Sequence, residues 1–272
     1  MIKLKALTTY LNETLDLKSV THDASNNGLQ IQGDKDVARA IFGVDFSMEI
    51  VNYAMERKAQ FIFVHHGQSW GSSLKYITGS NYNRIKPLIE NGISLYAVHL
   101  PLDKHTEYGH NVMMAKMINL QTVQPFFEYE GVNIGFKGNL NGGLSFDELS
   151  RKIRNELNGF INKNSKPYLY KLDNFGSNGA DNSSGRKLEK IGIVSGGGGH
   201  DSVLSAISEG LDCLITGEFN HSSFFFAKEA GLSVISPGHY LTETPGVLRM
   251  MQLVRKQFDG IEVEFADIPT GL

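Results

Sequence analysis

The sequence predicts an α/β protein of two domains, each a largely parallel sheet with flanking helices. Short apolar, β-rich runs alternate with segments of helical spacing along most of the 272 residues, which is the pattern of parallel sheets covered by helices. A hydrophobic content of 41% is enough to bury the cores of two modest domains or one large one. The character of the middle of the chain changes, which favours two domains.

The first part of the chain alternates predicted strands with predicted helices. Ser47 is a suitable N-cap for a helix whose apolar stripe includes Ile50 and Ala54. Asn91 and Gly92 form a helix-end signal. The predicted strands cover residues 40–44, 61–64 and 93–100, and the predicted helices begin at Ser47 and cover residues 84–90 and 111–118.

The middle of the chain carries a different set of signals. Ser145 opens a predicted helix with Glu148 at the capping-box position. Residues 174–185 are rich in Gly, Ser and Asn without apolar periodicity, and they are predicted to form a long exposed loop. Predicted strands cover residues 131–140, 167–172, 191–194, 213–216 and 232–236, and predicted helices cover 202–209, 222–230 and 245–257.

Composition excludes several classes of function. The formal charge of -3 and the pI near 6.3 leave no basic excess to neutralise a phosphate backbone, so nucleic acid is not an expected partner. The single cysteine, Cys213, cannot form an internal disulfide, which favours a reducing, cytoplasmic compartment. No apolar run approaches the roughly 18 residues that span a bilayer, and the start lacks the apolar part of a secretory signal. We therefore expect no membrane insertion or export.

Two adjacent histidines, His65 and His66, follow a buried apolar strand and precede Gly67. Neighbouring side chains of a strand point to opposite faces. The pair therefore suits two different metal ions, or one ion and a supporting role, better than ligation of one ion side by side. The alternative is two surface histidines at a strand end.

The next apolar strand also ends in polar residues, His99 and Asp103. Ligands of open parallel sheets bind beyond the carboxyl ends of the strands, so both strand ends are expected to deliver side chains to one crevice. Asp103 could bridge two metal ions through its two oxygens. Its alternative role is that of a loop or helix-cap aspartate.

A third strand end precedes His239 and Glu243. Pro245 fits the first turn of the following helix, so the two residues are predicted to line a loop that enters this helix rather than one helix face. Glu243 could meet a cation there, or it could be a first-turn acid favoured by the helix dipole.

Together, the three strand ends supply five candidate metal ligands: His65, His66, Asp103, His239 and Glu243. Nitrogen and oxygen ligands suit zinc, iron, manganese, cobalt or nickel. A site without cysteine favours a catalytic centre over a closed structural zinc site. Two such ions could lower the pKa of a bridging water and bind a substrate oxygen.

These segments resemble the GTP cyclohydrolase 1 type 2 family, also described as dinuclear-metal-centre hexameric proteins. The resemblance covers nearly the whole chain. Its motifs are Ser-Asn-Asn-Gly-Leu-Gln at residues 25–30, His-His-Gly at 65–67, His-Leu-Pro-Leu-Asp at 99–103, Thr-Gly-Glu at 216–218, and Gly-His-Tyr at 238–240 with Glu243. Two departures are a Gly-His-Asn run at 109–111 and the extra length at 174–185.

The resemblance implies that the five candidate ligands hold two divalent metal ions per chain. It also implies a discontinuous metal-site domain, residues 1–125 and 237–272, with a second α/β domain inserted at 126–236 and the metal site between the two. The implied assembly is a homohexamer, a ring of dimers. The implied substrate is a small molecule, a nucleotide.

Four other features carry alternatives. Glu218 and His99 lie near strand ends and are candidates for proton transfer, for support of the metal ligands, or for structural roles. The glycine run at residues 196–199 could cradle a phosphate or form a simple tight turn. Trp70 could line the mouth of the pocket or serve packing.

The leading functional hypothesis is a metal-dependent hydrolase that opens the guanine ring of GTP. A metal-activated hydroxide would attack the ring carbon between the imidazole nitrogens, and Glu218 or His99 would move protons. Two alternatives are a non-enzymatic metal-binding or regulatory scaffold and a two-metal phosphoesterase.

Overall fold

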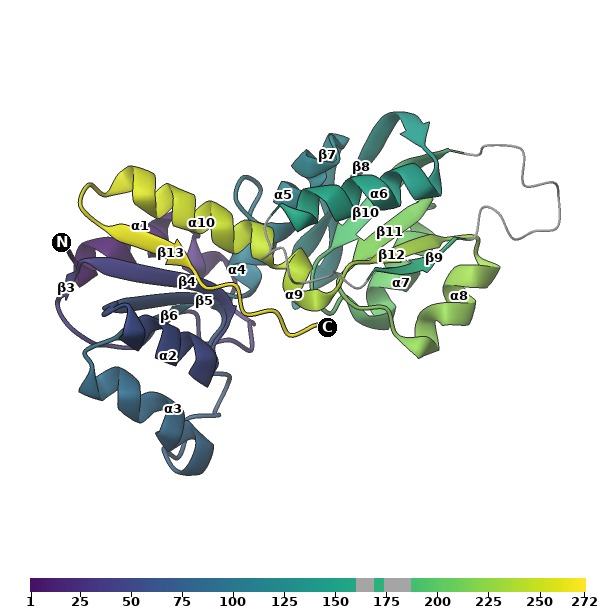
Figure 1. The fold of residues 1–272 in the computed structure, drawn as a ribbon. Helices are drawn as coiled ribbons and strands as arrows, with labels where there is room; N and C mark the ends of the chain where they lie inside the picture. Colours follow the sequence, from purple (N-terminus) through teal and green to yellow (C-terminus); the bar gives the residue numbers. More distant parts are fainter. Residues whose placement is uncertain (160–168, 174–186) are drawn as a thin grey trace. The chain divides into compact units, whose positions relative to one another are not determined.

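A computed structural model describes residues 1–159, 169–173 and 187–272 and divides the chain into two compact units (Figure 1). The first unit contains Met1–Tyr108 and Gly246–Ile268, and the second contains Gly109–Pro245 and Pro269–Leu272. Both are α/β units with helices flanking a sheet, so the predicted fold class is confirmed. The predicted loop at residues 174–185 lies outside the described residues.

The first unit is built on a five-stranded sheet of order β13-β4-β5-β6-β2. Four neighbouring strands are parallel, and only β2 is antiparallel. The strands are β2 (Gly28–Ile31), β4 (Arg39–Asp45), β5 (Phe61–His66), β6 (Ser94–Ala97) and β13 (Glu262–Phe265). The helices are α1 (Leu4–Thr14), η1 (Leu17–Ser19), α2 (Met48–Glu56), α3 (Gly79–Glu90), α4 (Leu100–Asp103) and most of α10 (Thr244–Gln257), and β1 (Ile2–Lys3) pairs with β3 (Asp36–Val37).

Successive side chains of the central strands point to opposite faces of the sheet, so the core of this unit has two layers. Ile41, Ile62 and Leu95 belong to one cluster with the buried side chains of α2 and α3. The intervening residues carry stacked aromatic rings, with Phe63 between Phe42 and Tyr96. Figure 1 shows α1 and α10 on the sheet face opposite α2 and α3. Because both faces are covered, the central strands are apolar throughout, as expected for a parallel sheet.

Phe63→Ala is expected to lower the free energy of unfolding of the first unit by about 3–5 kcal/mol, because it leaves a cavity in the buried aromatic layer. Phe63 is fully buried, with ring centroids 5.1 Å from Phe42 and 5.8 Å from Tyr96. Urea unfolding followed by the fluorescence of Trp70, the only tryptophan, would measure the loss. Ile89→Ala, at a position 62% exposed, is the control and should change stability by less than about 0.5 kcal/mol. Equal losses in both variants would contradict this account.

The second unit has a six-stranded sheet of order β7-β8-β10-β11-β12-β9. Strands β10, β11 and β12 are parallel, whereas β7, β8 and β9 are added in antiparallel pairs, so this sheet is mixed rather than largely parallel as predicted. The strands are β7 (Gln121–Tyr129), β8 (Val132–Leu144), β9 (Tyr170–Leu172), β10 (Leu188–Val194), β11 (Cys213–Thr216) and β12 (Ser233–Ser236). The helices are α5 (His110–Met117), α6 (Phe146–Asn158), α7 (Gly199–Ser208), η2 (His221–Ser223), α8 (Phe224–Glu229) and α9 (His239–Thr242).

Local capping signals placed several elements correctly. The Ser47 hydroxyl accepts a hydrogen bond from the amide of Ile50 at the start of α2. Ser145 and Glu148 form the predicted capping box of α6. The predicted strand at residues 93–100 is too long, because β6 ends at Ala97 and the chain turns into α4 after His99.

The structure moves both predicted domain boundaries. Helix α5, predicted within the first domain, packs against β8 and β10 and therefore groups with the second unit. The turn α9 contacts α5 and joins the same unit, so the chain returns to the first unit at Gly246 rather than at residue 237. The first unit then receives α10 and the edge strand β13.

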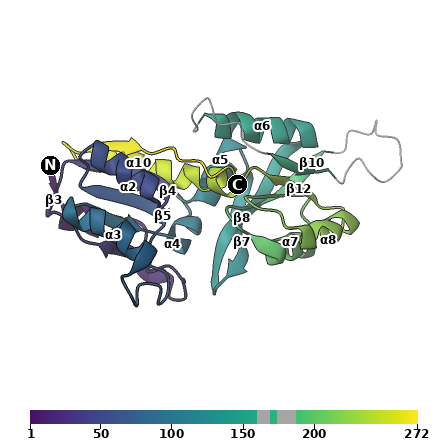
Figure 2. The same cartoon turned by 60° about the horizontal axis from the view of Figure 1, so that its bottom comes forward.

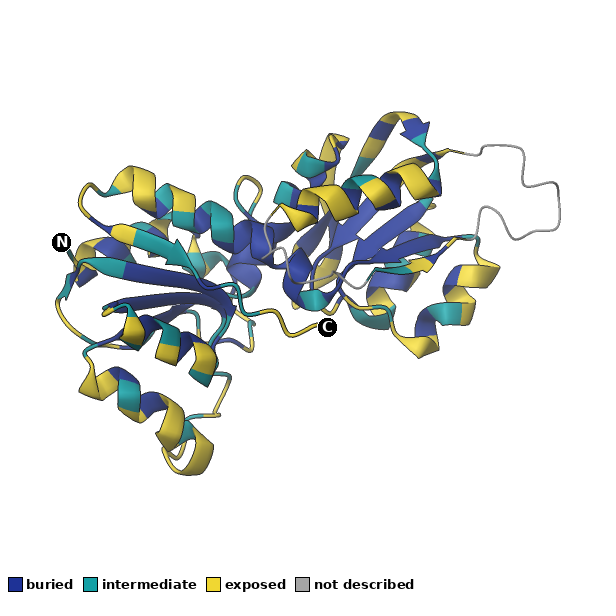
Figure 3. Cartoon of the chain, viewed as in Figure 1, coloured by how far each residue is buried: buried dark blue, intermediate teal, exposed yellow. Residues whose placement is uncertain are grey.

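Burial follows the same layered pattern in each unit. Figure 3 shows buried residues concentrated on the central strands, while the helices alternate buried and exposed positions, and Figure 2 shows the same elements from a second direction. Among the described residues, no helix combines the length and the apolar character that crossing a bilayer requires.

Candidate metal centre

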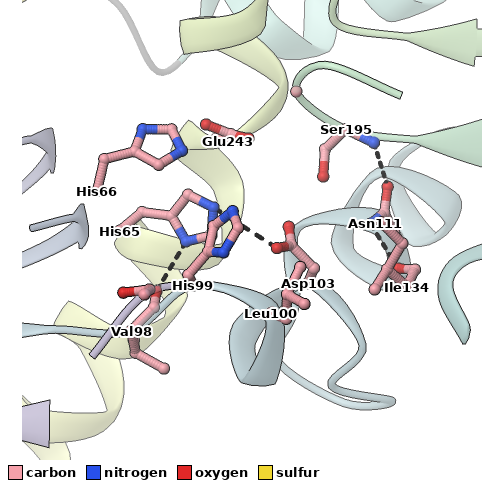
Figure 4. A network of polar contacts seen from close by, with 12 residues as sticks. His65, His66, Val98, His99, Leu100, Asp103, Asn111, Ile134, Ser195 and Glu243 are labelled. Carbon is pink, nitrogen blue, oxygen red and sulfur yellow. Dashed lines mark hydrogen bonds and ion pairs between the residues drawn. The ribbon is translucent and has the colours of Figure 1, made fainter. Parts of the chain in front are cut away.

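The carboxyl end of β5 presents two anchored imidazole rings. His65 is fully buried, and its Nδ1 donates to the carbonyl oxygen of Val98 at 2.8 Å (Figure 4). His66 Nδ1 is 2.8 Å from Oδ1 of Asp45, the last residue of β4. The expectation that the two side chains point to opposite faces is wrong, since the ring centroids lie 4.5 Å apart. Pairing with β6 stops at Val64, whereas pairing with β4 continues to His66.

A third anchored imidazole, His99, follows β6 in the same unit. Its Nδ1 lies 2.8 Å from Oδ1 of Asp23, a carboxylate whose side chain is 3% exposed. Burial acts to raise the pKa of Asp23, but hydrogen bonds from His99 and Asn27, together with the His99 charge, lower it below its ordinary value. One ring nitrogen from each of His65, His66 and His99 lies within 4.8 Å of the others. The first unit therefore brings together three imidazoles that suit a metal ion.

Asp103 reaches the same cluster from the short helix α4. It is the last residue of that helix and is buried, at 5% exposure. Its Oδ2 lies 3.6 Å from His65 Nε2. Figure 4 marks this contact with a dashed line between the two side chains. Asp103 is therefore an inward-facing carboxylate at the C-terminal end of α4, and its position differs from that of an N-cap.

The second unit places His239 and Glu243 on one short helical turn. Gly238, with φ of 113°, allows the chain to turn from β12 into α9. His239 Nε2 lies 3.1 Å from Glu243 Oε1, four residues ahead, and Nδ1 lies 2.7 Å from Glu218 Oε1. The expected loop arrangement is thus wrong, because the turn continues helically until Glu243. Glu218 is a hydrogen-bond partner of His239.

The two carboxylates change the protonation of His239. Burial of the ring acts against protonation, but hydrogen bonds and charge from Glu243 and Glu218 outweigh it and raise the pKa of His239 to about 9. In the absence of a metal ion, His239 is therefore a cation at neutral pH. A metal ion bound at Nε2 has to displace this proton.

The glycine run between β10 and α7 lies against the same side chains of the second unit. A Cβ at Gly196 would come within 2.0 Å of Glu243 Oε1, so a larger residue cannot occupy this position unless the carboxylate moves. Figure 4 shows how Asn111 fixes the start of the run. Its Oδ1 accepts from the amide of Ser195 at 2.6 Å, and its Nδ2 donates to the carbonyl of Ile134 at 2.8 Å. The close approach of Glu243 explains why the first residue of the run, Gly196, has no side chain. Binding of a phosphate by the run stays a prediction.

The four histidines described above share one pattern, in that each Nδ1 has an oxygen partner. The partners are Val98 for His65, Asp45 for His66, Asp23 for His99 and Glu218 for His239. A carbonyl oxygen can only accept, so His65 carries a hydrogen on Nδ1. Such anchoring is typical of metal-binding histidines. Sequence reasoning missed Asp23 and Asp45. Their only signals were a position just before the motif at residues 25–30 and a position directly after an apolar strand run.

The two sheets and these side chains define an α/β protein with a candidate metal-binding site. Similarity then identifies the family. The chain belongs to the Duf34/NIF3 (NGG1p interacting factor 3) family, whose profile matches residues 2–270. A Pyrococcus horikoshii protein named "GTP cyclohydrolase 1 type 2 homolog" is 36% identical over 266 residues, covering 98% of each chain. The resemblance inferred from the motifs is therefore confirmed.

Solved structures extend this similarity to the fold. A protein described as "protein ybgI, unknown function" aligns over 100% of both chains with a TM-score of 0.83 and 30% identity. The protein TTHA1606 from Thermus thermophilus aligns over the same extent with a TM-score of 0.77 and 31% identity. The similarity covers both units, including the segments that carry the histidines.

Proposed function

We propose that this protein is a metal-dependent hydrolase with a dinuclear centre. The proposed ligands are His65, His66 and Asp103 from the first unit with His239 and Glu243 from the second. The supporting observation is that each proposed histidine ligand has an oxygen partner at Nδ1, a pattern that is typical of metal-binding histidines. Each unit supplies both imidazole and carboxylate, the ligand types that zinc, iron, manganese, cobalt and nickel accept.

The proposed reaction is the hydrolytic opening of a guanine nucleotide ring. The name of the Pyrococcus horikoshii relative supports this choice of substrate. Two divalent ions would supply an activated water at neutral pH. His99 is 21% exposed beside His65 and His66, and it is the better placed of the two proposed proton-transfer residues. Glu218 is proposed to orient His239, since its Oε1 is already occupied by the His239 ring.

The proposed assembly is a cytoplasmic homohexamer, a ring of dimers. The resemblance of the motifs to dinuclear-metal-centre hexameric proteins supports the assembly. Light scattering of the purified protein would give a mass six times that of the 30.1 kDa chain. A monomer at micromolar concentration would contradict it.

Metal analysis is the first test of the proposed function. We expect about two ions per chain in the wild-type protein and fewer in His65→Ala and Glu243→Ala, because each variant removes a ligand. Lys86→Ala, which changes an exposed residue of α3, is the control and should retain both ions. A wild-type protein that remains free of metal after incubation with zinc, manganese, cobalt, nickel or ferrous ions would overturn the proposal.

The products released from GTP distinguish the proposed ring-opening hydrolase from a two-metal phosphoesterase and from a non-enzymatic scaffold. Formate released from GTP, and lost on chelation, indicates ring opening. Inorganic phosphate indicates a two-metal phosphoesterase. Tight metal binding without turnover across a panel of nucleotides indicates a non-enzymatic scaffold.

A further inference from the structure

The motif at residues 25–30 supplies no proposed metal ligand, and its side chains instead fix the loop that follows His66. The Gln30 carboxamide oxygen accepts from the amides of Gln68 and Ser69 at 2.8 and 3.0 Å. Asn26 Nδ2 donates to Ser69 Oγ at 2.6 Å and to the carbonyl of Gly71 at 3.0 Å. These bonds hold the loop on both sides of Trp70.

Trp70 is held at both its backbone and its ring. Its amide donates to Ser73 Oγ at 2.8 Å, and its indole N–H donates to the carbonyl of Gly67 at 2.8 Å. The ring lies 5.0 Å from that of His99 and 6.0 Å from that of His66. Trp70 is nevertheless only half-buried. A rigid, partly exposed indole therefore lies beside the candidate metal residues of the first unit.

We propose that Trp70 is a stacking platform for a planar heteroaromatic ring of the substrate. The inference rests on the proposed function in that it takes the substrate to be a heterocycle processed beside His66 and His99. An immobilised indole loses little conformational freedom on binding, and a large aromatic surface favours offset stacking with any planar π system. Because its N–H is occupied by Gly67, Trp70 contributes stacking rather than hydrogen bonding. It therefore selects the class of planar heterocycles without distinguishing their ring substituents.

Trp70 is the only tryptophan of the chain, so its fluorescence reports directly on this position. The probe is guanosine, which carries the heterocycle without phosphate, and ribose 5-phosphate is the comparison ligand. Each is titrated into the full-length protein after chelation and after metal loading. We expect guanosine to change the fluorescence in a saturable manner in both preparations, whereas ribose 5-phosphate does not.

Variants separate stacking from packing. Calorimetry on Trp70→Ala should show guanosine binding weakened about tenfold, the loss expected for one stacked base. Trp70→Phe should keep most of the affinity, which also guards against misfolding in the alanine variant. Tyr76→Ala, a change at an aromatic residue 70% exposed in the following segment, is the matched control and should bind normally. Metal content should be unchanged in all three variants.

Three outcomes would overturn the proposal: no guanosine binding to the wild-type protein, equal affinity in Trp70→Ala, or an equal loss in Tyr76→Ala. A metal-loaded protein that fails to bind guanosine would refute stacking alone. A protein that binds guanosine after chelation but never holds metal would support stacking and refute the dinuclear centre. The two proposals therefore fail separately.

Discussion

Asp103→Ala is expected to abolish both metal occupancy and turnover. The carboxylate is 5% exposed and lies 3.6 Å from His65 Nε2. Its removal takes one oxygen ligand from the proposed centre. Loss of an outer hydrogen-bond partner at a metal site already costs about 10–100-fold in affinity or activity, so loss of a ligand should exceed about 100-fold. Elemental analysis and formate release measure the two effects.

Two further variants test this interpretation. Asp103→Asn keeps the size of the side chain but not its charge, so it should fold normally and still lose metal. Asp147→Ala removes an exposed carboxylate of α6, whose side chain is 78% accessible, and it should retain wild-type metal content and activity. An active, metal-free Asp103→Ala protein would end the metal-dependent hypothesis.

Metal affinity is expected to fall about 50-fold between pH 9 and pH 7, because the ion competes with a proton on His239, which is already half protonated at pH 9. Glu243 and Glu218, acting against the effect of burial, raise the pKa of His239 to about 9 in the metal-free protein. Below that pH, each unit of acidification favours the proton over the metal by a factor of about ten. Zinc titrations at pH 7, 8 and 9 measure this slope, and buffers of different ionisation enthalpy reveal the released proton.

The raised pKa of His239 has the opposite effect on the stability of the metal-free protein, which is expected to fall as pH rises. A pKa raised in the folded state stabilises the fold fully below the ordinary value of 6.5, and this contribution is lost as pH rises through about 9. Urea unfolding of the chelated protein should therefore show decreasing stability over this interval. Glu218→Gln removes one of the two carboxylates and should flatten both profiles. Profiles that remain unchanged in Glu218→Gln would contradict the assignment to His239.

Strand and helix positions were predictable where local signals and burial agree. The apolar run at residues 61–64 of β5 indicates a buried strand, and Ser47 indicates the start of a helix. The hairpin of β7 and β8 was only half recognised, because β7 is mostly exposed and shows little apolar alternation. Strand β13 was missed for a related reason: none of its residues is fully buried, and its place in the sheet depends on pairing with the distant β4.

The convergence of His65, His66 and Asp103 was predictable because the carboxyl ends of parallel strands meet at one edge of a sheet. Their role as metal ligands stays a prediction. Their partners were less predictable. Asp23 lies 76 residues before His99 in the sequence, and only the folded sheet brings the two side chains to 2.8 Å. The helical turn at His239 was also missed. Pro245 suggested that the chain becomes helical only there, whereas a separate short helix, α9, precedes the start of α10.

The return of the chain to the first unit has a consequence for synthesis on the ribosome. Strand β13 pairs with β4, yet nearly all of the second unit, Gly109–Pro245, is translated between them. At usual rates of elongation, the first unit waits on the order of ten seconds for its edge strand and for α10. The second unit emerges almost complete during this interval. The nascent chain is therefore expected to finish folding its middle before its beginning, and a chaperone would meet the edge of β4 exposed throughout that time.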